Sequence, residues 1–101
     1  MAGINCIDYS TLTVSNTAVT LSTASPGIPS RARGAYITCE TDNVRWRADG
    51  TDPTSTEGHI IYATSGIVFD SSDDTNWRSV LLAIKFIRVT NDAALKITWY
   101  D

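Results

Sequence analysis

The chain has 101 residues and a formal net charge of −3, from 8 Lys and Arg against 11 Asp and Glu, and 43% of its residues are hydrophobic. This length fits one domain, residues 1–101, and the composition is that of a chain that folds. The acidic balance argues against a nucleic-acid binder that works through phosphate contacts and against a polybasic module for membrane surfaces. Ser and Thr together make 24 residues, which favours strands and turns over helices.

The first half of the chain predicts short strands between turns. Residues 12–21 alternate apolar and polar side chains around a turn at 15–16, and we expect a hairpin-like pair there. Residues 22–34 contain two prolines that cannot donate to a sheet, so we expect a loop. Residues 35–47 carry the clearest alternation, on both sides of a turn at 41–43, and predict a β-hairpin.

The middle of the chain is richer in turn formers. Residues 48–58 are dense in Gly, Asp and Pro and predict a long polar loop. Strands are expected at 59–63 and 67–70, with a turn between them, and another loop at 71–76.

The last quarter predicts one more pair of strands. Residues 77–84 fit a short helical turn or a buried strand, and their length favours the helical turn. Residues 84–89 and 95–100 alternate on both sides of a turn at 91–92 and predict a final hairpin. The expected fold class is therefore all-β: a single antiparallel β-sandwich or barrel of about seven to eight strands, with at most one short helix.

The cysteines, the apolar runs and the first residues indicate the cellular compartment in which the chain folds. Neither cysteine lies in a Cys-x-x-Cys pair, so we expect Cys6 and Cys39 to be reduced, buried thiols. The longest apolar run, residues 80–84, is far shorter than the roughly 20 residues of a spanning helix. Residues 1–6 lack the features of a secretory signal, and we expect folding in a cytoplasm, with no membrane partner.

Candidate catalytic groups are few. His59 is the single histidine and no Gly-x-Ser-x-Gly elbow is present, so we assign no catalytic residue. A paired-acid hydrolase site is a weaker alternative, built from Asp49, Asp52, Asp70 and Asp73. The same loops offer oxygen ligands for calcium, but they lack the EF-hand spacing, and we assign no metal and no cofactor.

The tryptophans divide into two groups. Trp46 and Trp99 share faces with core positions, and we expect them to be buried. Trp77 follows a polar loop and is the best candidate for an exposed contact. Together with Tyr62 it would make the platform of a carbohydrate-binding module, an alternative function.

Charge is unevenly placed along the chain. Residues 49–76 hold six acids and no Lys or Arg, whereas residues 31–47 hold four arginines against two acids. The plain interpretation is a solvated surface with local salt bridges. The alternative is a contact between an Arg-rich segment and the acidic loop of a neighbour. The candidate partner-contact residues are Arg31, Arg33, Arg45, Arg47, Asp49, Asp52, Glu57 and Trp77.

Three stretches carry a resemblance. Residues 44–54 read Val-Arg-Trp-Arg-Ala-Asp-Gly-Thr-Asp-Pro-Thr, with Glu-Gly-His at 57–59, and the alternating segments at 12–21 and 83–100 flank them. Over nearly the whole chain the pattern resembles small all-β proteins encoded among tailed-bacteriophage virion genes. It consists of strands, turns and an Arg-x-Arg-x-Asp-Gly-Thr loop, so it implies no catalytic residue.

The resemblance implies a structural virion protein that is assembled in the host cytoplasm. The first expectation is a capsid decoration or cement protein, a homotrimer that bridges major capsid subunits at local three-fold positions. The alternative within the particle is a neck or tail adaptor or a fibre-associated protein, which has a lower copy number.

Overall fold

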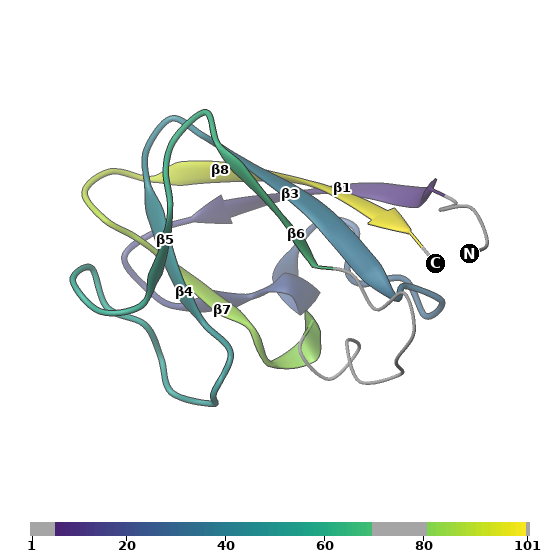
Figure 1. Ribbon diagram of the computed structural model, residues 1–101, viewed down its shortest axis with the longest axis horizontal. Helices are drawn as coiled ribbons and strands as arrows, with labels where there is room; N and C mark the ends of the chain where they lie inside the picture. Colours follow the sequence, from purple (N-terminus) through teal and green to yellow (C-terminus); the bar gives the residue numbers. More distant parts are fainter. Residues whose placement is uncertain (1–5, 70–80, 101) are drawn as a thin grey trace.

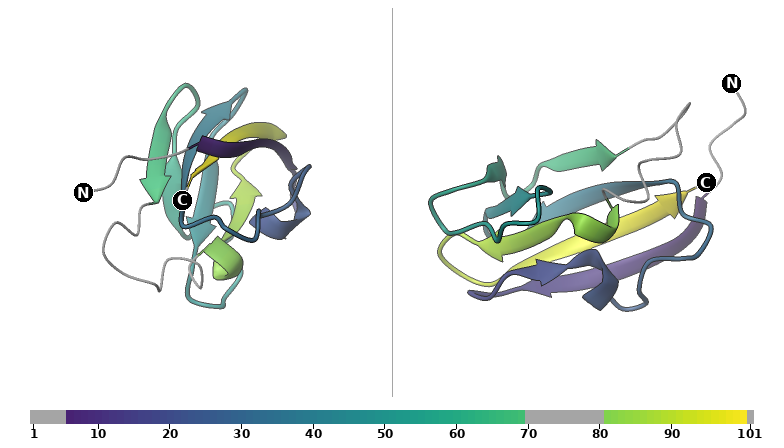
Figure 2. Two further views of the ribbon diagram at one scale, coloured as in Figure 1. Left: turned by 90° about the vertical axis from the view of Figure 1, so that its right-hand side faces the viewer. Right: turned by 90° about the horizontal axis from the view of Figure 1, so that it is seen from below.

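The computed structural model describes residues 6–69 and 81–100, and these residues form eight strands in two antiparallel four-stranded sheets (Figure 1). The two sheets pack face to face around one hydrophobic core. Figure 2 shows the same strands along the long axis of the molecule and from below. The expected all-β sandwich with seven to eight strands is confirmed.

Each sheet collects strands from distant parts of the sequence. Sheet A contains β1 (Cys6–Val14), β3 (Gly34–Glu40), β6 (Gly66–Phe69) and β8 (Ala93–Tyr100), in the order β1-β8-β3-β6. Sheet B contains β2 (Val19–Thr20), β4 (Val44–Arg47), β5 (His59–Ile61) and β7 (Lys85–Arg88), in the order β2-β7-β4-β5. A single 3-10 turn in the described residues, η1 (Leu21–Thr23), follows β2.

The chain changes sheet at almost every connection, so the predicted hairpins are wrong as pairings. The segments 12–21, 35–47 and 84–100 each contain two strands, but those strands lie in opposite sheets. Side-chain alternation shows which residues face the core, and an arch between two sheets buries the same alternate residues as a hairpin within one. The consecutive pair that shares a sheet is β4 and β5, on both sides of the predicted loop at 48–58.

Two side chains tie the arches together at one end of the sandwich. The Asn43 side-chain oxygen accepts a hydrogen bond from the Ala63 backbone N–H at 2.8 Å. The Asp42 carboxylate accepts from the backbone N–H groups of Asn91 and Asn43, and these bonds hold the pKa of Asp42 below its usual value. The predicted turns at 41–43 and 91–92 therefore stabilise each other across the two sheets.

The core follows the predicted alternation. Inward positions on β3 and β8 are fully buried, including Ile37, Leu95 and Ile97, and their outward neighbours are more exposed. From sheet B, Val44 and Phe86 meet them and are also fully buried. The sequence pattern thus predicted correctly which side of each strand faces the core, although it predicted the wrong strand pairs.

Two successive hydrogen bonds, one buried and one partly buried, run from β8 through β1 to residue 26. The indole Nε1 of Trp99, which has 0% exposure, donates to Ser10 Oγ at 2.7 Å. Ser10 Oγ in turn donates to the carbonyl of Pro26 at 2.5 Å. Next to it, Ser25 and Thr11 exchange two backbone hydrogen bonds along the outer edge of β1. The two hydrogen bonds therefore join β8, β1 and the segment that covers part of this edge.

The cysteine expectation is half wrong. Both cysteines are free thiols, and Cys39 is buried, but Cys6 is exposed because it is the first residue of an edge strand. Burial raises the pKa of the Cys39 thiol to about 11, with smaller contributions from the charges of Asp42 and Glu40.

The strand predicted at 59–63 is present over 59–61, and the one at 67–70 is present from 66 to 69. Residues 81–83 are helical and Leu81 is buried, in agreement with the helical interpretation of this segment. The loop expected at 71–76 and the contact candidate Trp77 lie outside the described residues. No helix in the described part of the chain has the length and apolar character needed to cross a membrane.

We predict that Ser10→Ala destabilises the protein by about 1–3 kcal/mol, because it leaves the buried Trp99 indole N–H without its acceptor. Urea unfolding followed by Trp fluorescence measures this change. Thr13→Ala is the matched control, because Thr13 lies on the same strand with its side chain exposed. Equal unfolding midpoints for the two variants would contradict a stabilising role for the Ser10 bond.

Candidate interaction surfaces

The loop at 48–58 is fixed against the outer face of sheet B. Arg45 projects from that face, and its Nε donates to the carbonyl of Ser55 at 3.1 Å. Its Nη1 donates to the carbonyl of Gly58 at 2.8 Å. One guanidinium therefore binds two backbone carbonyls near the end of the loop, which a lysine at this position would not reproduce.

Two ion pairs fix the first half of the loop. Arg47 donates to both carboxylate oxygens of Asp49, at 3.0 and 2.5 Å, and Lys85 Nζ donates to Asp52 Oδ1 at 2.8 Å. The hydrogen bond between Arg47 and Asp49 lowers the pKa of the carboxyl and raises the pKa of the guanidinium. Both pairs are partly exposed, so each stabilises the loop only modestly and less so at high salt.

Packing and backbone geometry also fix this loop. Pro53 is fully buried within it. Gly58 has a φ of 135°, and a Cβ at this position would lie 3.0 Å from the carbonyl oxygen of Trp46. A side chain at residue 58 would therefore push the loop off the end of β4.

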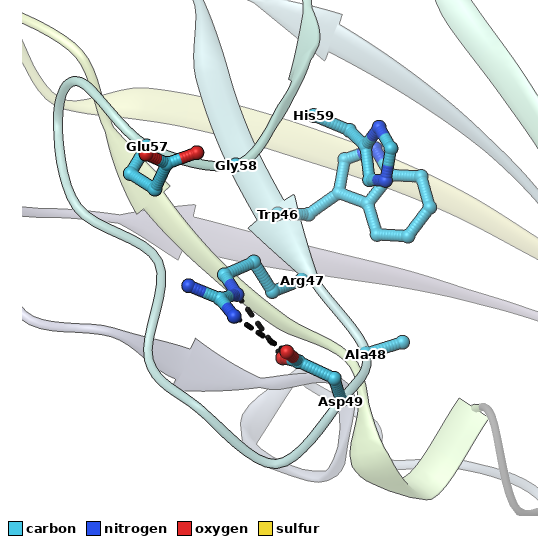
Figure 3. Close-up of a pocket in the computed structure, with 7 residues that line it drawn as sticks. All are labelled: Trp46, Arg47, Ala48, Asp49, Glu57, Gly58 and His59. Atoms are coloured by element: carbon cyan, nitrogen blue, oxygen red, sulfur yellow. Dashed lines mark hydrogen bonds and ion pairs between the residues drawn. The ribbon is translucent and has the colours of Figure 1, made fainter.

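An open pocket of about 530 Å³ lies where β4, β5 and the loop meet. It is lined by Trp46, Arg47, Ala48, Asp49, Glu57, Gly58 and His59. Figure 3 shows the Trp46 and His59 rings packed together on one side and the three charged side chains on the other, and the two rings are tilted by 37° with centroids 4.6 Å apart. Neighbouring residues of a strand point to opposite faces, so the aromatic and the charged groups do not converge.

Five of the eight predicted contact residues belong to this region: Arg45, Arg47, Asp49, Asp52 and Glu57. The first four make the contacts within the chain described above, and the side chain of Glu57 is exposed. The Arg-rich strand and the acidic loop therefore meet within one chain, as the plain interpretation of local salt bridges expects, and the alternative contact between neighbours is not needed to pair these four residues.

Arg31 and Arg33 lie elsewhere. They precede β3 at the right-hand end of Figure 1, and the backbone N–H of Arg33 donates to the carbonyl of Tyr100 at 2.9 Å. Both side chains are exposed. They do not share a surface with the 48–58 loop, which lies at the lower left of the same view.

The acidic candidates do not form a common site in the described residues. Asp49 and Asp52 pair with different cations, and Asp70 and Asp73 lie outside the described residues. Within residues 6–69 and 81–100, no three His, Cys, Asp or Glu side chains gather closely enough to hold a metal ion.

The aromatic residues are placed largely as expected. Trp99 is fully buried, whereas Trp46 is only partly buried and packs against the core, with its ring edge-on to Phe69 at 5.3 Å. The side chains of Tyr36 and Tyr62 are 46% and 60% exposed.

The outer face of sheet A is a surface that the sequence analysis missed. The register aligns Tyr9, Thr98, Tyr36 and Val68 in one row across all four strands. Each of these residues alternates with an inward neighbour, so its outward direction was readable from the sequence. The sequence could not show that these four residues form one row, because the row depends on which strands pair and in which register.

Searches of protein-family models, curated proteins and solved structures found no match to this chain. The described residues form a small all-β sandwich in which the outer face of sheet B carries a fixed polar loop and the outer face of sheet A exposes Tyr9, Tyr36 and Val68. Its function is therefore inferred from these two surfaces.

We predict that Arg45→Lys frees the end of the 48–58 loop, with amide hydrogen exchange in residues 54–58 about tenfold faster. This corresponds to the loss of one hydrogen bond from a charged donor to a carbonyl. Hydrogen exchange followed by mass spectrometry measures it, and Lys96→Arg on the opposite outer face is the control. Unchanged exchange in this loop would show that Arg45 does not hold it.

Proposed function

We propose that the chain is a non-catalytic structural protein of a tailed-bacteriophage particle, and in particular a decoration protein that attaches to the head and bridges major capsid subunits. The resemblance of residues 12–21, 44–54 and 83–100 to small all-β virion proteins supports this proposal. The structural observation that carries it is the fixed geometry of the 48–58 loop.

A loop that is already ordered binds a rigid partner at lower cost, because ordering a flexible segment on binding consumes free energy. Three basic side chains and the buried Pro53 hold this loop. Thr51, Thr56 and Glu57 are exposed on its fixed backbone and are available to a partner. Such a surface suits attachment to a repeating protein lattice.

The mechanism is mechanical. Each copy adds buried area across a junction between capsid subunits, and many weak contacts acting together stabilise the shell. The protein joins the virion during assembly in the host cytoplasm. A trimer suits local three-fold points of the lattice and a pair suits local two-fold points. A neck or tail position is the alternative, and a low copy number per particle would identify it.

The test is binding of the purified protein to particles that lack it, measured by co-sedimentation and by copy number per particle. We predict that Glu57→Lys lowers the affinity for particles about tenfold, because it reverses an exposed charge at the centre of the contact without removing a residue that holds the loop. Ser65→Lys, in the exposed turn between β5 and β6, is the matched control.

Failure of the unmodified protein to bind any virion part would overturn the proposed function. Binding that is equal for Glu57→Lys and the control would instead place the contact away from the 48–58 loop.

A further inference from the structure

The outer face of sheet A, called the sheet-A face below, has few charges for a chain with 19 charged residues. Its outward residues on the four paired strands are Cys6, Tyr9, Thr11, Thr13, Gly34, Tyr36, Thr38, Glu40, Gly66, Val68, Ala94, Lys96, Thr98 and Tyr100, of which Gly34 and Tyr100 at one end are buried. Glu40 and Lys96 are the two charged members. Aromatic side chains and few charges are typical of the core of protein interfaces.

The largest exposed side chains of the face lie in its central row. Tyr9 is 53% exposed, Tyr36 is 46% exposed and Val68 is 55% exposed. A Cβ added at Gly66 would lie 3.3 Å from the Tyr36 hydroxyl, so the Tyr36 ring lies along the sheet over this glycine. The surface along this row is therefore nearly flat. A flat surface is suited to packing against the outer face of another sheet.

The two charges make the face complementary to itself. Lys96 on β8 is opposite Thr38 on β3, and Glu40 lies two residues further along β3. A two-fold axis that passes between these two side chains places Lys96 of one copy opposite Glu40 of the other, and Glu40 of the first copy opposite Lys96 of the second. The face has no net charge, so two acidic chains can approach there without the repulsion of their net charge of −3.

The area of the sheet-A face bears on how strongly two copies can associate through it. Four strands of nine, eight, seven and four residues, spaced ~4.8 Å apart with ~3.3 Å per residue, present roughly 450 Å² in flat projection. This projection is smaller than the ~800 Å² of accessible area that each partner contributes to a standard interface, so a pair formed through this face is expected to be weak and to depend on concentration.

We propose that the sheet-A face is the contact between two copies of this chain, which pack sheet against sheet around a two-fold axis. This goes beyond the proposed function, because it concerns association of the free protein and a face opposite the 48–58 loop. The expected homotrimer needs two different surfaces that meet around a closed ring. The two outer faces of a sandwich point in opposite directions, so a contact between them would stack copies into an open row.

The test uses sedimentation equilibrium of the full chain at micromolar concentration. A pair has a mass of 22.0 kDa, twice 11.0 kDa. We predict that Lys96→Glu weakens the pair about a hundredfold, because like charges then meet across the axis. The double variant Lys96→Glu with Glu40→Lys restores the pair, because the charges are exchanged and still complementary.

Glu57→Lys on the other side of the sandwich is the control and keeps the mass of the pair, and circular dichroism checks that each variant is folded. A monomer, or a trimer whose mass does not respond to Lys96→Glu, would overturn the proposal. So would saturable glycan binding by the monomer that is lost in Tyr36→Ala. None of these outcomes alters the particle-binding test, so a failure of the pair and a failure of the proposed function remain distinguishable.

Discussion

The hydrogen bond from the Trp99 indole to Ser10 is the contact on which the sandwich depends most directly. It joins residues 89 positions apart in the sequence and lies in a core with 0% exposure. β8, which carries Trp99, is inserted between β1 and β3, so sheet A is complete only when the last described strand is in place. The Ser10 hydroxyl in turn donates a hydrogen bond to the carbonyl of Pro26, which follows the residue that pairs with the edge of β1.

Local pattern predicted the strands and the core, and failed on their pairing. Val44 and Ile97 were assigned correctly to the interior, because alternation is a property of each strand alone. Hairpin pairings failed because the turn at 41–43 bends the chain equally well within a sheet or between two. Tertiary contacts determine that this turn connects the two sheets, and they include the hydrogen bonds that the side chains of Asp42 and Asn43 accept from distant backbone N–H groups.

The same limit applies to the surfaces. Sequence reasoning connected Arg45 and Arg47 with the acidic loop, but left open whether they meet within one chain or between neighbours. Because β4 and β5 pair in one sheet, the loop between them folds back over its own arginines. The row that contains Tyr9 and Tyr36 went unseen, since these residues come together only in the observed register. One outer face is therefore covered in part by the chain's own 48–58 loop, and the other is the face proposed above for self-association.

The difference between the two faces is tested most directly by hydroxyl-radical footprinting of the free protein at low and at high concentration. Tyr9 and Tyr36 should lose reactivity on association, while Tyr62, which is 60% exposed and lies between β5 and β6, outside the strands of the sheet-A face, keeps its reactivity and serves as the internal reference. Protection of Tyr62 or of the 48–58 loop, with Tyr9 and Tyr36 unchanged, would contradict the assignment of the sheet-A face to self-association.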